Sequence, residues 1–331
     1  MAAILFGTTG TARALGPDVS PLGVGASRIA VGAALLAIVA AALARRNARS
    51  DATRAADPGD TTLPADPGET TRPASAPAPA SLRAPAPVPH PWSAKAVLIG
   101  GAGVGGYQLA FFAAVADTGV AVGTVVALGS APVFTGILSR VTQGVRLDAR
   151  WAACTALATA GVAVLVTSSG SNATVSPLGV ALALGAGAGY ATYTVAAKRL
   201  LDHGHAPEAV MARTFGTGAL ILLPVIPATG FSALATAPAI TEALYLGAIP
   251  TALAYVLFAR GLRHLPTAEV ATLTLAEPLT AAALGTIVLG EQLAATAALG
   301  AAMVLGGLAA LAVKPRRPRR TRPPVVQDAA T

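Results

Sequence analysis

The chain has 331 residues, of which 54% are hydrophobic and only 11% are charged, and its mean hydropathy is +0.64. A soluble protein of this length could not bury so much apolar surface, so the composition excludes an ordinary soluble domain and indicates an integral membrane protein. The single cysteine, Cys154, has no partner within the chain. That excludes a disulfide framework and a cluster of thiolate metal ligands.

The net charge of +8 would suit a nucleic-acid partner, but the basic residues lie in the wrong places for one. They flank apolar runs, where lysine and arginine fix the orientation of a membrane protein. We therefore predict no nucleic-acid partner. The two richest clusters are Arg45, Arg46, Arg49, Arg54, Arg72 and Arg83, and Lys314, Arg316, Arg317, Arg319, Arg320 and Arg322.

Nine apolar stretches approach the ~20 residues that a helix needs to cross a bilayer. A tenth, at 2–15, is shorter and begins at Met1; it is either a thin, tilted span or the end of a longer one, and a signal peptide is disfavoured because no basic residues precede it. We predict an all-α polytopic membrane protein with ten transmembrane helices. The nine longer stretches are 21–44, 95–116, 119–140, 151–168, 177–197, 208–229, 241–261, 267–289 and 293–313.

Two segments break this apolar pattern. Residues 46–92 are rich in Asp-Pro-Gly and Pro-Ala units, a composition that cannot form a core, so we expect a disordered cytoplasmic linker there. Residues 314–331 are expected to form a basic, disordered tail.

The distribution of lysine and arginine predicts the topology. With both termini in the cytoplasm, the inner segments collect 20 of the 23 basic residues, and the outer loops have none. This asymmetry favours a multi-pass protein of the cytoplasmic membrane with cytoplasmic N- and C-termini. The rule does not place Arg13, Arg28 and Arg213, which fall within or near spans.

The sequence matches itself at a constant offset of 146 residues, which pairs Pro132 with Pro278, Gly144 with Gly290 and Gly161 with Gly307. Before the linker the offset becomes 186, and Arg13 then faces Arg199. Chance similarity between alanine-rich segments is the alternative interpretation. We predict one five-helix repeat at 1–168 and a second at 169–313. Because five is odd, the repeats are inverted in the membrane, as in alternating-access transporters.

Glu277 is the most informative polar residue. It lies about 11 residues into its span, roughly 16 Å along the helix, and so close to the middle of a ~30 Å hydrocarbon core. A carboxylate at that depth is costly and suggests a functional site, although a hydrogen-bonded glutamate in a helix interface remains the alternative. Pro278 is expected to free the carbonyl of Thr274 toward a cavity, and Pro132 to interrupt the matching helix of the first repeat.

Other polar residues in the spans are candidates for a substrate or proton pathway. Arg28 and Arg213 occupy nearly matching positions in the two repeats, and each could instead extend its charge to the interface. Aromatic and amide side chains on the third and sixth helices could line the pathway or serve as interface anchors. These are Tyr107, Gln108, Tyr190 and Tyr193.

Several short motifs favour a structural interpretation over a functional one. The pattern GxGxxG at 101–106 lies in an apolar span without a βαβ unit, so we predict a close helix contact and no dinucleotide site. His203 and His205 lack further metal ligands nearby, and we predict no metal site and no cofactor. Asn172 begins a glycosylation sequon that matters only in a secretory-pathway host.

Ser20-Pro21 followed by Arg28, the Glu277-Pro278 region, and Leu289-Gly290-Glu291-Gln292-Leu293 together resemble the drug/metabolite transporter superfamily, EamA type. The usual aromatic-glycine signature of the first helix is reduced here to Phe6-Gly7. The resemblance implies a ten-helix bundle with a central cavity that exports or exchanges small metabolites or drugs.

We therefore predict a secondary transporter that moves small metabolites or drugs across the cytoplasmic membrane, in the direction of export, and not an enzyme. The alternatives are a non-transporting membrane scaffold and an intramembrane enzyme, but one carboxylate near the middle of the membrane is too little for a catalytic site. The expected partners are the lipid bilayer and a small-molecule substrate. Protons are the candidate coupling ion, and a homodimer is the candidate assembly.

Overall fold

The structure, a computed structural model, describes residues 1–56, 91–168, 176–228, 235–290, 292 and 294–313. All regular elements in these ranges are helices, as the sequence predicts. The tail 314–331, most of the linker (57–90) and the sequon at Asn172 lie outside the described residues.

Eight of the described helices are long and apolar enough to cross a membrane, and α1 and α7 are shorter, with 14 and 16 residues. Together they correspond to the ten predicted spans. The elements are α1 (Ala2–Leu15), α2 (Pro21–Ala56), α3 (Ala94–Thr118), α4 (Val120–Gln143), α5 (Ala149–Thr167), α6 (Pro177–Asp202), α7 (Pro207–Leu222), α8 (Val225–Ala228), α10 (Ala237–Gly247), the π-helix η1 (Ala248–Leu253), α11 (Ala254–His264), α12 (Thr267–Leu273), the 3-10 helix η2 (Thr274–Ala276), α13 (Glu277–Val288) and α14 (Ala295–Ala312).

Local sequence signals set several helix ends. The side chains of Ser93, Asp148 and Ser176 accept hydrogen bonds from backbone N–H groups in the first turns of α3, α5 and α6. Gly144, which follows α4, and its repeat mate Gly290, which follows α13, both adopt left-handed backbone with φ of 67° and 71°. Glycine reaches this region without steric cost, so corresponding turns close corresponding helices of the two halves.

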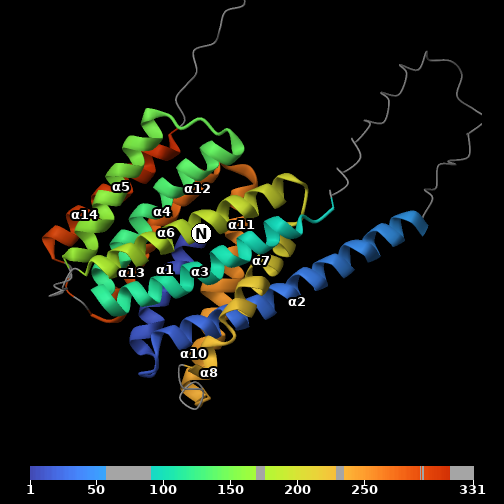
Figure 1. The fold of residues 1–331 in the computed structure, drawn as a ribbon, viewed down its shortest axis with the longest axis horizontal. Coiled ribbons are helices and arrows are strands. Elements are labelled where there is room, and N and C mark those ends of the chain that lie inside the picture. The colour runs from blue at the N-terminus through green and yellow to red at the C-terminus, as the bar shows by residue number, and fades with distance from the viewer. Residues whose placement is uncertain (57–90, 169–175, 229–234, 291, 293, 314–331) are drawn as a thin grey trace, which may run out of the picture.

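The helices form one bundle in which the two halves interlock (Figure 1). Helices α5 and α14 pack side by side, and α2 packs along α7. Helix α6 lies against α3 and α4, while α1 lies against η1, α11 and α13. The contacts of α6 with α3 and α4 thus have counterparts in those of α1 with η1, α11 and α13.

Two close backbone contacts between α5 and α14 are related to each other by the sequence offset of 146 residues. A Cβ added at Gly161 would lie 2.7 Å from the carbonyl oxygen of Gly300, and one added at Gly307 would lie 2.8 Å from the carbonyl oxygen of Cys154. A shift of 146 residues exchanges these two contacts. Only glycine allows the backbones to approach so closely at these positions.

The crossings of α2 with α10 and of α7 with α3 show the same relation. A Cβ at Gly32 would lie 3.2 Å from the carbonyl oxygen of Gly247, and a Cβ at Gly218 would lie 3.2 Å from that of Gly101. The offsets of 186 and 146 residues convert the first contact into the second. Gly101 begins the glycine-rich pattern of α3, so this pattern serves close helix packing, as predicted.

Two expectations about helix continuity are wrong. Helix α2 continues to Ala56, ten residues beyond the predicted start of the linker at 46, because residues 46–56 are mostly alanine and arginine, which favour helix. Pro132 does not interrupt α4, which stays α-helical throughout. Ser130 and Thr135 flank Pro132. Their hydroxyls donate to the carbonyl oxygens of Ala127 and Ala131.

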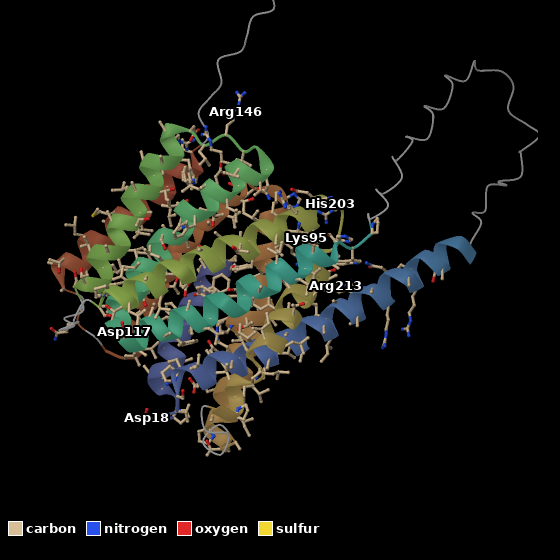
Figure 2. The ribbon with its side chains drawn as sticks, viewed as in Figure 1. Asp18, Lys95, Asp117, Arg146, His203 and Arg213 are labelled. Atoms are coloured by element: carbon tan, nitrogen blue, oxygen red, sulfur yellow. The ribbon has the colours of Figure 1, made fainter. Side chains whose placement is uncertain are left out.

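The titratable residues labelled in Figure 2 lie toward two ends of the bundle. Lys95, Arg146, His203 and Arg213 lie toward one end, and Asp18 and Asp117 lie toward the other. We refer to these as the basic end and the acidic end. The separation agrees with the division of loops that the basic residues predict.

Candidate functional site

A small polar cavity lies between the two halves of the bundle. The first half contributes α1, α2, α3 and α4 to its wall, and the second contributes α6, η1, α11, η2 and α13. The lining residues are Phe6, Thr9, Arg28, Tyr107, Leu128, Ala131, Tyr190, Pro250, Tyr255, Thr274 and Glu277. Four of these were predicted pathway residues.

Glu277 lines the cavity beside a break in its helix. Residues 274–276 form a 3-10 turn, and Glu277 and Pro278 open the new helix α13. A proline in the first turn of a helix loses no hydrogen bond, since the first N–H groups have no intrahelical acceptor. The prediction that the carbonyl of Thr274 is free is wrong, because its oxygen accepts the N–H of Glu277 across the tight turn. It is the side chain of Thr274 that lines the cavity.

A second interruption brings Pro250 and Tyr255 to the same cavity. The span from Ala237 to His264 contains the π-helix η1, in which the hydroxyl of Thr251 donates to the carbonyl oxygen of Leu246 at 2.8 Å. Wide turns of this kind occur often at functional sites. Irregular backbone at membrane depth is tolerated where it lines a cavity, and both interruptions do so.

Arg28 is held in the cavity wall by Gln108. The Nη2 group of Arg28 donates to Gln108 Oε1 at 3.2 Å, and Gln108 Nε2 donates to the carbonyl oxygen of Gly25 at 3.4 Å. Gln108 is only 1% exposed, so it acts behind the wall and not as a lining residue. The Nε atom of Arg28 is buried without a hydrogen-bond partner, which leaves part of the guanidinium available to an anionic group.

Arg28 and Glu277 line the same cavity without pairing. Among the described residues, the ion pairs within 4.0 Å are Arg13 with Glu242 and Lys198 with Asp202. The site therefore presents one cationic and one anionic group at separate places. Two separate opposite charges can engage the two ends of a solute that carries both charges.

Aromatic rings surround these charges. Nine of the fourteen aromatic residues form one connected set of ring contacts, and four of the nine line the cavity. Rings offer an apolar wall and can also interact with cations through their faces. The set comprises Phe6, Tyr107, Phe111, Phe112, Tyr190, Tyr193, Phe215, Tyr255 and Phe258.

A hydrogen bond between two cavity-lining residues joins α6 to η2. Thr274 Oγ1 donates to the carbonyl oxygen of Ala271 at 2.7 Å, so its oxygen accepts the hydroxyl of Tyr190 at 3.2 Å. This contact ties α6 to the broken span beside Glu277.

The cavity has a small volume. Its volume is about 40 Å³, room for one or two water molecules, whereas sites that hold a small-molecule ligand usually measure ~300 Å³ or more. A small-molecule solute could enter only after the helices separate, and in this sense we call the state occluded.

The other predicted pathway residues lie behind or away from the wall. Tyr193 is 1% exposed and packs against Tyr190 and Tyr255, and Pro132 and Pro278 are buried beside the lining residues Ala131 and Glu277.

Arg213 is exposed, and its guanidinium lies 3.8 Å from the centre of the Trp92 ring. The offset of 186 residues pairs Arg28 with the buried Thr214, not with Arg213. A displacement of one residue turns a side chain by ~100° around a helix. Arg213, which was predicted as a pathway residue, therefore does not line this cavity.

Sequence analysis missed several lining residues, above all Thr9, Pro250 and Tyr255. Pro250 carried a usable signal, because it interrupts an apolar span just as Pro278 does. Among the described residues, no group of three or more His, Cys, Asp or Glu side chains could hold a metal ion.

A bundle of membrane-spanning helices around an occluded, charged cavity between two halves has the architecture of a membrane transporter. A model of the EamA-like transporter family matches residues 177–313. A Bacillus subtilis (strain 168) protein described as an uncharacterized transporter, YwfM, is 36% identical over 226 residues, which cover 68% of this chain and 76% of that one. The chain belongs to the EamA-like transporter family.

Other similar proteins carry related descriptions. A probable amino-acid metabolite efflux pump of Escherichia coli (strain K12) is 30% identical over 188 residues, 53% of this chain and 62% of that one. An uncharacterized transporter of Archaeoglobus fulgidus is 29% identical over 198 residues, 60% of this chain and 69% of that one. A solved crystal structure matches with a TM-score of 0.70 at 20% identity, over 94% of this chain and 93% of that one, and so shares the fold.

Proposed function

We propose that this membrane transporter exports small metabolites that carry both an anionic and a cationic group, with amino-acid derivatives as the first candidates. The observation that carries the proposal is the pair of opposite, separate charges, Arg28 and Glu277, in one occluded cavity. Arg28 would bind a carboxylate, Glu277 would bind an ammonium group, and the surrounding rings would accept an apolar side chain.

The direction of export and the class of substrate gain support from the efflux pump to which the chain is similar. Transport would proceed by alternating access, in which the halves separate first at one end of the bundle and then at the other. Protons are the proposed coupling ion, with Glu277 as their carrier, because a carboxylate that lines a closed membrane cavity can gain a proton when the substrate leaves. The proposed assembly in the membrane is a homodimer.

A panel of amino acids, their methyl esters and their N-acetyl derivatives separates the two charge roles. Binding is measured as a rise in melting temperature of the purified protein, and transport as counterflow of radiolabelled compound in proteoliposomes. The zwitterions should stabilise the protein and be transported, whereas esters and N-acetyl compounds should do so weakly. Equal stabilisation by esters and parent amino acids would contradict a role for Arg28 in carboxylate binding.

The variant Glu277→Gln tests the second charge. It keeps the shape of the side chain and removes the charge, so the protein should melt like the parent and lose transport by about 100-fold, the loss expected when ~3 kcal/mol of a buried charged contact is removed. Unchanged counterflow would return Glu277 to a packing role.

The proposed orientation has the basic end in the cytoplasm. Single cysteines in place of Asp117 and of His203, in a Cys154→Ala background, lie at opposite ends of the bundle (Figure 2). An impermeant maleimide added to intact cells should modify the first and not the second. The reverse pattern would overturn the orientation.

A further inference from the structure

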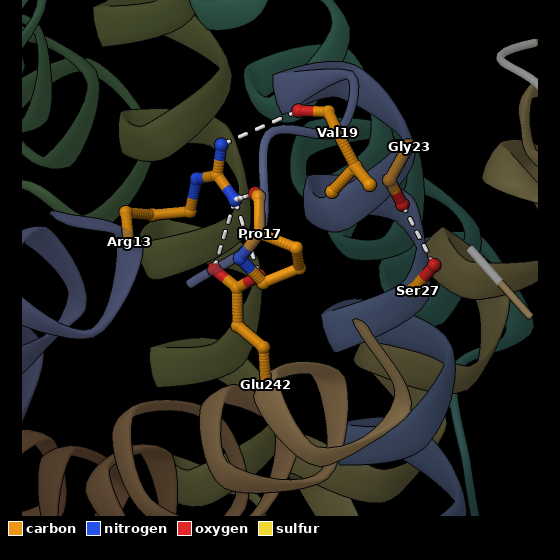
Figure 3. Close-up of polar contacts among 6 residues, drawn as sticks. All are labelled: Arg13, Pro17, Val19, Gly23, Ser27 and Glu242. Carbon is orange, nitrogen blue, oxygen red and sulfur yellow. Dashed lines mark hydrogen bonds and ion pairs between the residues drawn. The ribbon is translucent and has the colours of Figure 1, made fainter. Parts of the chain in front are cut away.

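The acidic end of the bundle contains an ion pair that the transport cavity does not include. Arg13, at the end of α1, donates through Nη1 to both carboxyl oxygens of Glu242 in α10, at 3.0 and 3.1 Å (Figure 3). We call this contact the outer pair. Its partners are 229 residues apart in the sequence, so it joins the first half of the chain to the second.

Arg13 also holds the loop between α1 and α2. Its Nη1 donates to the carbonyl oxygen of Pro17 at 3.4 Å, and its Nη2 donates to that of Val19 at 3.3 Å. One guanidinium thus connects three segments: the end of α1, the α1–α2 loop and the middle of α10 (Figure 3).

The outer pair is buried more deeply than an ordinary surface ion pair. The side chain of Glu242 is only 4% exposed, and that of Arg13 is 28% exposed. A Cβ added at Gly16 would lie 2.7 Å from the Glu242 carboxyl, so the loop closes tightly over the carboxylate. A charge shielded in this way depends on its partner far more than an exposed one does.

The two helices that the outer pair joins continue directly into the cavity wall. Thr9 lines the cavity and lies four residues, about one helical turn, before Arg13 in α1. Pro250 lines it from the other side and follows Glu242 by eight residues, about two turns. A route from the cavity to the acidic end between these helices would pass the outer pair.

Within the part of the chain that the structure describes, the basic end has no ion pair at the equivalent position. The repeat offsets replace Arg13 by Arg199 and Glu242 by Ala96, so the carboxylate is missing there. Arg199 instead donates to the carbonyl oxygen of Thr142 at 2.9 Å. The two ends of a bundle with otherwise matching contacts therefore differ at this position.

We propose that the outer pair is the gate of the acidic end: it holds α1 and α10 together in the occluded state and must separate for the cavity to open at that end. The inference rests on the proposed transport function, since it assigns a gate to that cavity. It adds that opening at the acidic end costs the separation of a buried ion pair, whereas the side-chain contacts described at the basic end between Arg199 and Thr142 and between Thr267 and Gln143 are hydrogen bonds.

A cysteine in the cavity reports on the gate without any substrate. The reporters are Thr9→Cys and, separately, Leu128→Cys, both at lining positions, in a Cys154→Ala background. An impermeant maleimide is added from whichever side modifies Asp117→Cys, an exposed residue of the acidic end. The measurement thus requires no knowledge of the orientation of the protein in the membrane, and it does not depend on transport.

The informative variant is Glu242→Gln, because it removes the buried charge and leaves Arg13, the more exposed partner, to water. We expect both reporters to be labelled about tenfold faster than in the parent, a shift of ~1.4 kcal/mol in the opening equilibrium. The charge exchange Arg13→Glu with Glu242→Arg should bring labelling back toward the parent rate. Lys198→Gln, which removes the Lys198–Asp202 pair within α6 at the basic end, should change neither reporter.

Unchanged labelling of both reporters in Glu242→Gln would overturn the gate and leave the outer pair as a purely structural contact. Equal acceleration by Lys198→Gln would overturn it as well, because loosening of the whole bundle would then explain the result. The melting temperature of each variant separates unfolding from opening. Since no substrate is used, a failure of the gate and a failure of the proposed export are told apart.

Discussion

The two halves of this chain use the same glycine contacts but differ in the continuity of their central helices. In the first half, α3 and α4 are uninterrupted α-helices. In the second half, the corresponding spans are interrupted by η1 at Pro250 and by η2 before Pro278. The outer frame of the bundle is thus symmetric, and the wall of the cavity is not.

The difference explains where the chemistry lies. The repeat offset places Ala131 of α4 opposite Glu277, and both line the cavity. In one half this position lies within a regular helix and carries a methyl group, and in the other it opens a new helix and carries a carboxylate. A shared packing frame can therefore tolerate a local change in one copy that creates a binding site.

The largest effect should come from the symmetric frame. Gly307→Val places a branched side chain where a Cβ would already lie 2.8 Å from the carbonyl oxygen of Cys154, so we expect a loss of ~3 kcal/mol or more in stability. Gly161→Val, its repeat mate, should cost a similar amount. Gly306→Val is the matched control, since its nearest neighbour would lie at 3.9 Å. Melting temperature and yield measure the effect, and unequal losses at the two mates would break the symmetry argument.

A smaller effect is expected at the asymmetric prolines. Pro278→Ala allows the α-helix to continue through 274–277 and should reduce counterflow about tenfold, because the Glu277 side chain would shift relative to the other lining residues. Pro132→Ala should leave transport unchanged, since α4 is already continuous, and should add up to ~1 kcal/mol of stability through the restored hydrogen bond. Loss of transport in Pro132→Ala alone would reverse the roles of the two helices.

Arg28 and Arg213, which were predicted to occupy matching positions, should differ in their effect on transport. Arg28→Gln removes the only positive charge among the cavity-lining residues and should raise the apparent KM for zwitterions about tenfold. Gln108→Leu should reproduce part of this rise, because Gln108 holds Arg28 in place.

The smallest effect is expected for Arg213→Gln. It removes an exposed cation–π contact with Trp92, worth ~0.5–1 kcal/mol of stability, and should leave counterflow unchanged. A transport defect in Arg213→Gln with unchanged melting would contradict our exclusion of Arg213 from the cavity.

Sequence reasoning found the features that follow from the pattern of apolar residues and from the free-energy cost of placing a charge in a membrane. Long apolar stretches predicted the spans because a helix must satisfy its backbone within a bilayer. Glu277 stood out because a carboxylate is expensive at the centre of a membrane. The offset of 146 residues predicted which glycines of α5 and α14 would occupy equivalent contacts.

It failed where the answer depended on the face of a helix or on distant partners. Arg213 and Thr214 are neighbours in sequence, yet one is exposed and the other is buried. Tyr255 carries no signal of its own, and it reaches the cavity because the wide turn of η1 rotates the following helix. Glu242 and Arg13 could be matched only after the fold had brought α1 and α10 together.

The sequence by itself determined the membrane environment, and it predicted the ten spans, the two repeats and the costly carboxylate, because these follow from composition, length and periodicity. The tertiary structure alone decided that Pro278 opens a helix while Pro132 lies within one, that Gln108 holds Arg28 beside the cavity, and that Arg13 meets Glu242. These contacts depend on the rotation and crossing of helices far apart in the chain, and a one-residue change in register moves a side chain to another face of its helix.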